Sequence, residues 1–170
     1  PLLREQLIDY IKLETSEWKR SRQDVLLAQF LDEAATVFAT EAAARGFAFE
    51  RTIGIGRDLR VSMDGDLVYR ALENLVDNAF RYATPASPIR FEAAQDAQQV
   101  LVRIINRGAG ISEKDIPFIF EPFYRGSRTR GETGFGLGLS VVKSVISSHG
   151  WDVTVRSHDG ETCFAIAIPT

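Results

Sequence analysis

Residues 73–83 read ENLVDNAFRYA, and the rest of the chain is interpreted outward from this stretch. Asn74 and Asn78 stand one helical turn apart, and Arg81 and Tyr82 follow three and four residues beyond Asn78, so all four share one face of a helix. The apolar residues fall on a neighbouring stripe: Leu72, Leu75, Val76 and Ala79. Two carboxamides, a guanidinium and a phenol beside an apolar stripe indicate a binding site. Asn is an indifferent helix former, and an exposed pair at this spacing is also compatible with a plain surface.

Flanking residues define the ends of this helix and the elements before it. Asp64 can cap the first amides and Pro85 forbids continuation. Four elements are predicted upstream: a short amphipathic helix over residues 2–14, a polar connector over 15–24, a helix over 27–45, and two half-buried strands over 47–52 and 59–63 joined by a turn.

The downstream residues alternate between strands, glycine loops and helix. The predicted elements are a strand pair over 88–94 and 100–105, the loop NRGAGI over 106–111, a short capped turn from Ser112, the aromatic run FIFEPFYRG over 118–126, a polar loop over 125–134, a helix over 138–149 and a hairpin over 151–156 and 162–168. Helices and strands interleave without strict alternation. The prediction is therefore an α+β two-layer sandwich, in which about three helices pack on a mixed sheet.

Two glycine-containing stretches suggest close approach to a ligand. In NRGAGI, Gly108 and Gly110 directly follow a strand, where missing Cβ atoms admit a flat ligand, although a plain turn explains them equally well. In GETGFGLGLSVVK, Gly134, Gly136 and Gly138 precede a helix whose first amides could bind phosphate oxygens. No buried strand leads into this stretch and no Gly-Lys-Ser/Thr follows, so it is neither a dinucleotide fingerprint nor a Walker loop. A flexible hinge is the alternative.

Composition and charge exclude several other classes. A formal charge of −3 without a polybasic run argues against nucleic acid as a partner. Cys163 is the single cysteine and is expected to be a small core residue in a strand, and with no paired histidine a zinc site is not expected. His149, at a helix end where a cation is favourable, and His158, in a His-Asp-Gly turn, are interpreted as structural or exposed.

No apolar stretch approaches the roughly 20 residues needed to cross a bilayer, so the chain itself is expected to be soluble and cytoplasmic. Its first residue is Pro1, not Met. This suggests that the chain was cut from a longer protein, and the sequence leaves open whether that protein is anchored in the inner membrane.

In their order along the chain, ENLVDNAFRYA, NRGAGI, FIFEPFYRG and GFGLGL resemble the N box, first glycine box, F box and second glycine box of sensor histidine kinases of the GHKL superfamily. The resemblance implies the Bergerat ATP-binding fold, with residues 1–17 as the end of a dimerisation helix and its linker and residues 18–170 as the catalytic domain. It also implies ATP and Mg²⁺ as cofactors.

The resemblance implies particular roles for the residues of these boxes. Asn78 would coordinate Mg²⁺, and Asn74 and Arg125 would share catalytic roles with it. Phe120 and Phe123 would anchor a lid. The implied nucleotide-binding residues are Asn74, Asn78, Arg81, Tyr82, Asn106, Gly108, Gly110, Ile111, Phe120, Arg125, Gly134, Gly136, Leu137, Gly138 and Leu139.

Two positions separate the alternatives for activity. Relatives that hydrolyse ATP carry Glu where this chain has Asn74, and an amide cannot serve as a base. Asn106 stands where the family usually has Asp, which costs charge assistance to the adenine amino group, on the order of 1 kcal/mol. A less favoured reading is that the NH₂ group of Asn106 faces the base and relaxes specificity for adenine.

The leading hypothesis is a protein-histidine kinase fragment that transfers the γ-phosphate of ATP to a histidine on a dimerisation domain absent from this chain. In the whole protein, a homodimer is expected and a response regulator receiver domain is the partner downstream. The alternatives are a pseudokinase that senses nucleotide without transfer and, less favoured, a GHKL-type ATPase.

Overall fold

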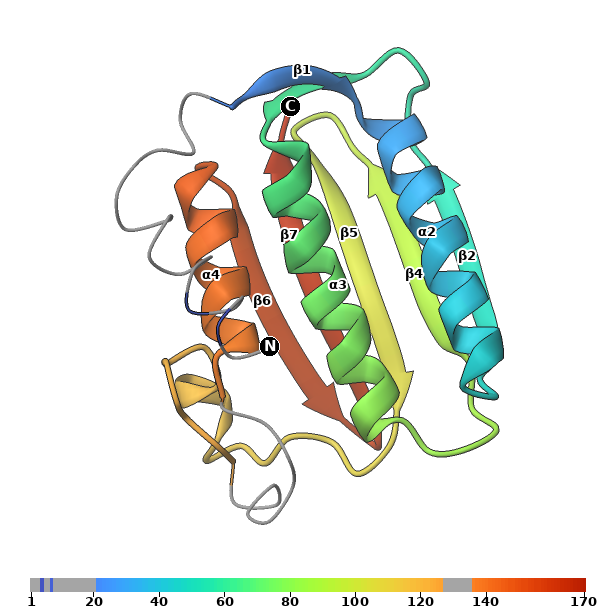
Figure 1. The fold of residues 1–170 in the computed structure, drawn as a ribbon, viewed down its shortest axis with the longest axis vertical. Coiled ribbons are helices and arrows are strands. Elements are labelled where there is room, and N and C mark those ends of the chain that lie inside the picture. Colours follow the sequence, from blue (N-terminus) through green and yellow to red (C-terminus); the bar gives the residue numbers. More distant parts are fainter. Residues whose placement is uncertain (1–3, 5–6, 8–20, 127–135) are drawn as a thin grey trace.

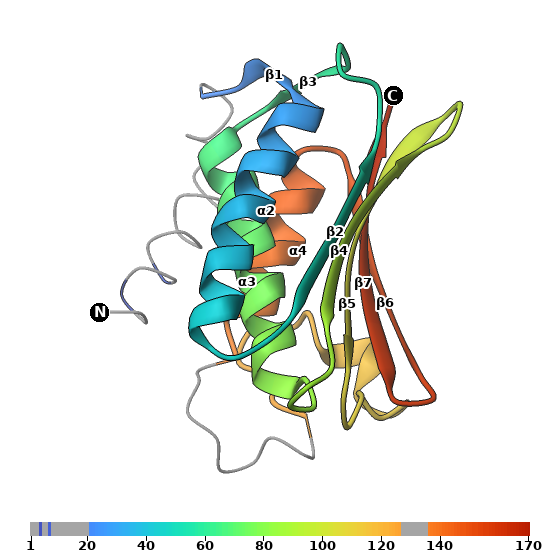
Figure 2. The ribbon, with the colours of Figure 1, turned by 90° about the vertical axis from the view of Figure 1, so that its right-hand side faces the viewer.

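The structure is a computed structural model that describes residues 4, 7, 21–126 and 136–170. Within them a five-stranded sheet is covered on one face by three long helices, and the two layers are seen edge-on in Figure 2. In chain order the elements are β1 (Gln23–Leu26), α2 (Leu27–Ala44), β2 (Phe49–Gly54), β3 (Arg60–Met63), α3 (Gly65–Tyr82), β4 (Ile89–Gln95), β5 (Gln99–Arg107), the 3₁₀ helix η2 (Ile116–Phe118), α4 (Gly138–Ser148), β6 (Asp152–His158) and β7 (Glu161–Pro169).

The sheet has the order β2-β4-β5-β7-β6 (Figure 1). β2 runs parallel to β4 and the other neighbours are antiparallel, so the sheet is mixed and the predicted two-layer fold class is confirmed. Parallel strands require a long crossover, which α3 supplies between β2 and β4. The fold therefore holds α3 in the middle of the helical layer.

One strand prediction needs correction. The strands predicted over 47–52 and 59–63 exist as β2 and β3, but they lie in different sheets, because β2 pairs with β4 while β3 pairs with β1. β1 itself was expected to be polar connector. Its residues become strand because Gln23 and Leu26 face Met63 and Arg60 across an antiparallel ladder that satisfies both backbones.

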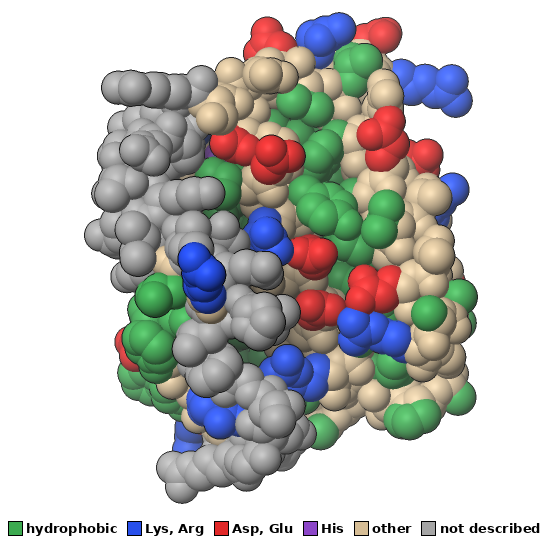
Figure 3. Space-filling view, in the orientation of Figure 1, with side chains coloured by type: hydrophobic (Ala, Val, Ile, Leu, Met, Phe, Trp, Pro, Cys, Tyr) green, Lys and Arg blue, Asp and Glu red, His purple; other side chains and the backbone are tan. Residues whose placement is uncertain are grey.

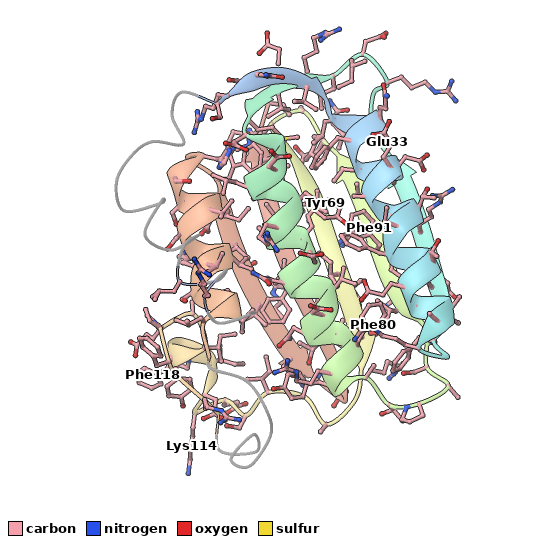
Figure 4. The ribbon with its side chains drawn as sticks, in the orientation of Figure 1. Glu33, Tyr69, Phe80, Phe91, Lys114 and Phe118 are labelled. Carbon is pink, nitrogen blue, oxygen red and sulfur yellow. The ribbon has the colours of Figure 1, made fainter. Side chains whose placement is uncertain are left out.

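The core lies between the helices and the inner face of the sheet. Phe38 of α2 packs 6.1 Å from Phe91 of β4 and 5.6 Å from Tyr69 of α3, measured between ring centroids, and Figure 4 shows Tyr69 and Phe91 between these two helices. Cys163 lies in a strand as expected, but it alternates with the buried Thr162 and Phe164 and so lies on the outer face of the sheet, away from the helical core. Partial burial raises the pKa of its thiol.

Local signals set the helix and hairpin ends as predicted. Asp64 caps α3, since its Oδ1 accepts a hydrogen bond from the Leu67 amide at 3.1 Å. Asp159 and Gly160 both have positive φ, as a type I′ turn requires between β6 and β7, and His158 beside them is exposed. His149 is structural, but it is not the cation that the helix end suggested, because burial lowers the pKa of its imidazole and keeps it neutral.

Several predictions concern residues outside the described part of the chain. The helix over residues 2–14, most of the polar loop over 125–134 and the domain boundary at residue 17 remain predictions. Among the described residues, no helix combines the length and apolar character needed to cross a membrane.

Candidate functional site

The four polar residues of α3 share one helix as predicted and approach the start of α4. The Asn74 side-chain nitrogen donates a hydrogen bond of 3.3 Å to the Gly138 carbonyl oxygen. Asn78 and Tyr82 continue this face toward the carboxyl end of the helix and are half-buried, while Arg81 is exposed. The Asn78 amide makes no hydrogen bond to any other residue in the described part of the chain, so it is open to a ligand.

The first glycine loop lies directly on the end of α3. Gly108 forms an isolated bridge with Ala83, and its amide donates to the Gly160 carbonyl at 2.8 Å. A Cβ at position 108 would overlap the Tyr82 carbonyl oxygen, so only glycine permits this contact. The loop predicted from NRGAGI is thus held beside the asparagine-bearing helix, at the lower edge of the molecule in Figure 1.

Three polar residues form a row at the same end of the sheet. Asn106 of β5 pairs with Thr162 of β7, which pairs with Ser157 of β6. The Ser157 and Thr162 hydroxyl oxygens are 2.9 Å apart, and the Ile111 amide donates to Ser157 Oγ at 2.8 Å. Asn106 is only 4% exposed, yet its amide has no hydrogen-bond partner among the described residues. The Asn106 amide is not among the described side-chain atoms that are fully buried without a partner, so its polar end keeps contact with solvent and can be reached by a ligand.

Sequence reasoning found Asn106 and missed Thr162 and Ser157. The His-Asp-Gly turn contained the signal for one pair, because a two-residue turn sets Ser157 opposite Thr162. Asn106 and Thr162 lie side by side because β5 pairs with β7, and no local sequence pattern indicated that pairing.

The second glycine stretch leads into the uncapped start of α4. The amide of Phe123 donates to the Gly136 carbonyl at 3.0 Å, and Gly136 has φ of 72°, with a hypothetical Cβ 2.7 Å from the Tyr124 carbonyl oxygen. The residue before α4, Leu137, makes no side-chain cap. The first amides of α4, at Gly138 and Leu139, are therefore available to phosphate oxygens. Gly134 lies outside the described residues.

Asp115, which the sequence indicated only as part of a capped turn, links the two ends of the aromatic segment. Asp115 is buried and accepts hydrogen bonds from Tyr124 Oη at 2.7 Å and Ser112 Oγ at 2.9 Å. Figure 4 shows Phe118 at this corner, below α4, and its ring lies 5.6 Å from that of Tyr124.

The two phenylalanines predicted to anchor the lid behave differently. Phe120 packs edge-on against Phe164, with centroids 6.2 Å apart, and so contacts the core. Phe123 is 65% exposed and anchors nothing by burial, so that expectation was wrong for Phe123. Its positive φ turns the chain toward Gly136. Arg125 follows on the exposed side of the same segment.

Glu73 belongs to a different surface. Its carboxylate lies 3.5 Å from Arg70, and burial together with the nearby Asp77 and Glu41 raises its pKa. Acidic side chains gather over the middle of α2 and α3 in Figure 3. Since Glu41 belongs to α2, Glu73 faces the α2 side of α3, while Asn74 faces α4. The described residues contain no group of three or more His, Cys, Asp or Glu that could hold a metal ion.

Comparison with known proteins agrees with this fold. A family model described as histidine kinase-, DNA gyrase B- and HSP90-like ATPase matches residues 63–170. The sensor protein VanSC of Enterococcus gallinarum is 32% identical over 119 residues, covering 69% of this chain and 33% of that protein. The alginate biosynthesis sensor protein KinB of Pseudomonas aeruginosa is 30% identical over 161 residues, covering 94% and 26%.

The chain therefore spans about a quarter to a third of the length of these curated relatives. A solved structure of the mycobacterial sensor histidine kinase MprB superposes with a TM-score of 0.76 at 26% identity, covering 86% of this chain and 97% of that one.

Proposed function

Because the chain belongs to the family of histidine kinase-, DNA gyrase B- and HSP90-like ATPases, we propose that it transfers the γ-phosphate of Mg-ATP to a histidine on a separate dimerisation domain. Within that family it is an ATP-binding catalytic domain of the histidine kinase type. The observation that carries the proposal is the meeting of α3 with the first turn of α4, where the Asn74 amide donates to the Gly138 carbonyl. This contact brings an amide-bearing helix and an uncapped helix N-terminus to one site.

The nucleotide would lie across the carboxyl end of α3. The buried Asn106 amide suits the polar edge of the base, Tyr82 and the loop of Gly108, Gly110 and Ile111 would border the base, and Phe120 would close it from the aromatic segment. The amides of Gly136, Leu137, Gly138 and Leu139, with Gly134 before them, would face the phosphates. Arg81 and Arg125 are exposed cations that would pair with phosphate oxygens through charge-assisted hydrogen bonds.

The residues present fit a magnesium ion that arrives with the nucleotide. Asn78 offers a side-chain oxygen without a competing partner in the described part of the chain, and Mg²⁺ prefers few protein ligands together with phosphate oxygens and water. The ion, when bound, would neutralise charge that develops on the transferred phosphoryl group. The part of Asn78 is to hold one coordination position at a fixed place on a rigid helix.

The contacts of Asn74 and Glu73 favour transfer over hydrolysis. Activation of water requires a base at the phosphate end of the site. Asn74 there is an amide, whose nitrogen donates to the Gly138 carbonyl. Glu73 faces α2 and Arg70 instead. Catalysis would then rest on positioning and charge stabilisation, with the acceptor histidine supplied by another domain.

We further propose that the whole protein acts as a homodimer and passes the phosphoryl group to a receiver domain of a response regulator. The curated relatives named as sensor proteins, which are three to four times longer than the matched region, support this proposal.

The test combines this chain with purified dimerisation fragments that carry an acceptor histidine, using ATP labelled at the γ-phosphate and Mg²⁺. We expect label on the fragment, its loss on substitution of the acceptor histidine, and at least about a hundredfold slower transfer with Asn78→Ala. Thr154→Val on the exposed edge strand β6 is the matched control and should transfer at the normal rate.

Release of phosphate without an acceptor would identify an ATPase instead. Binding of ATP without transfer to any of several acceptor fragments would identify a nucleotide-sensing module. Absence of nucleotide binding by calorimetry would refute the proposal as a whole.

A further inference from the structure

The base-reading end of the proposed site is built from neutral groups alone. Asn106, Thr162 and Ser157 form one row across β5, β7 and β6 on the inner face of the sheet. The next residue along β7 from Thr162, Glu161, points to the opposite face and pairs with Arg90 at 3.0 Å. The row therefore consists of one amide and two hydroxyls, and the neighbouring Glu161 carboxylate does not join it.

No protein contact fixes the orientation of the Asn106 amide. The side chain is 4% exposed, and among the described residues none donates a hydrogen bond to its oxygen or accepts one from its nitrogen. An amide presents an acceptor and a donor side by side, and rotation by half a turn about its last side-chain bond exchanges them. Both orientations are thus open to Asn106.

The hydroxyl pair beside it is equally adaptable. Ser157 Oγ accepts from the Ile111 amide at 2.8 Å and lies 2.9 Å from Thr162 Oγ1. If Ser157 donates to Thr162, the Thr162 proton is free to point at a ligand. If Thr162 donates to Ser157, a lone pair of Thr162 faces the ligand instead. The contact between the two hydroxyls and the bond to Ile111 survive in both arrangements.

Purine bases differ in which of two adjacent ring-edge positions, position 6 and N1, donates a hydrogen bond and which accepts one. A 6-aminopurine presents a donor at position 6 and an acceptor at N1, and a 6-oxopurine presents the reverse pattern. An amide that can rotate matches either pattern with two hydrogen bonds. An ionised carboxylate only accepts, and so opposes the oxygen of a 6-oxopurine.

We propose that this site binds 6-oxopurine nucleotides nearly as well as adenine nucleotides, because Asn106 and Thr162 can each reverse their hydrogen-bonding sense. The proposal rests on the proposed function, since it assumes that the base lies against this row. It identifies Asn106 as the residue that sets base specificity in this chain.

The test measures Kd by calorimetry for ADP, inosine diphosphate and UDP, each with Mg²⁺ at one ionic strength, on the unmodified chain. We expect ADP and inosine diphosphate to agree within about tenfold, and UDP to bind at least about tenfold more weakly than either. A preference for ADP above about tenfold would overturn the inference and leave the proposed function intact. Equal binding of UDP would also overturn it, because the base would then not be read. No binding of ADP would remove the proposed function as well.

Asn106→Asp tests the residue itself. We expect the ratio of the Kd for inosine diphosphate to the Kd for ADP to rise by at least about tenfold, since two acceptors would then face each other. Thr154→Val, an exposed position outside the row, should leave the ratio unchanged. An unchanged ratio in folded Asn106→Asp would refute the role of Asn106. If circular dichroism shows that this variant does not fold, the comparison on the unmodified chain still decides the proposal, because it needs no substitution.

Discussion

Replacing His149 with Gln should lower stability at neutral pH and remove a pH dependence that the buried imidazole imposes. His149 follows the last turn of α4, where Nδ1 donates to the Val145 carbonyl at 2.7 Å and Nε2 accepts from the Asp64 amide at 3.1 Å. These partners assign the neutral tautomer with the proton on Nδ1. The ring thereby joins the end of α4 to the cap of α3, and it lies 4.9 Å from the Trp151 ring.

The sign of the pH effect follows from the direction of the pKa shift. Burial lowers the pKa of His149 below the ordinary value of 6.5, so the unfolded chain takes up a proton at a higher pH than the folded chain does. The stabilisation is complete above the unfolded pKa and is lost as pH falls toward the folded pKa. The slope is at most about 1.4 kcal/mol per pH unit. Protonation would also turn Nε2 into a donor that faces the Asp64 amide.

The assay is urea unfolding of the natural chain and His149→Gln at pH 5, 6, 7 and 8. We expect the variant to lose about 2 kcal/mol at pH 8, because the shorter amide cannot satisfy both buried partners. Burial raises the pKa values of Glu73 and Asp77, which act with the opposite sign, but both residues are present in the two proteins. The difference between the two curves therefore isolates His149. If that difference stays constant from pH 8 to pH 5, the neutral buried imidazole is disproved.

Two further substitutions test contacts that hold the site together. Gly108→Ala should destabilise the chain by about 3 kcal/mol in urea unfolding and abolish nucleotide binding in calorimetry, because the added Cβ would overlap the Tyr82 carbonyl oxygen. Gly54→Ala is the control. Its Cβ would lie 3.6 Å from its nearest neighbour, so stability should change by no more than about 0.5 kcal/mol. Equal effects of the two glycine substitutions would contradict the close contact. Asp115→Ala should cost about 2 kcal/mol in the same assay by depriving the Tyr124 and Ser112 hydroxyls of their acceptor, and a variant as stable as the natural chain would contradict the role of Asp115.

Local chemistry explains why much of the candidate site could be predicted. Asn74 and Asn78 share a face wherever that segment is helical, and Asp64 and Pro85 bound the helix through effects on their immediate neighbours. Gly136 has the left-handed backbone conformation that glycine adopts most readily, and the uncapped start of α4 follows directly after it. These properties depend on residues a few positions apart, so sequence reasoning could find them.

The features that sequence reasoning missed depend on contacts between segments that lie far apart along the chain. Among the described residues, the sequence by itself determined the helices α2, α3 and α4, most strands, the glycine turn before α4 and the asparagine face, because each is decided by spacing, caps and turn residues within about ten positions. Only the tertiary structure decided that β3 pairs with β1, that Thr162 lies beside Asn106, that Glu73 faces α2, and that His149 is a neutral link and not a cation. The physical reason is that strand pairing and burial depend on which distant segments meet. A side chain such as His149 loses its hydration, and its pKa shifts, only when those segments pack around it.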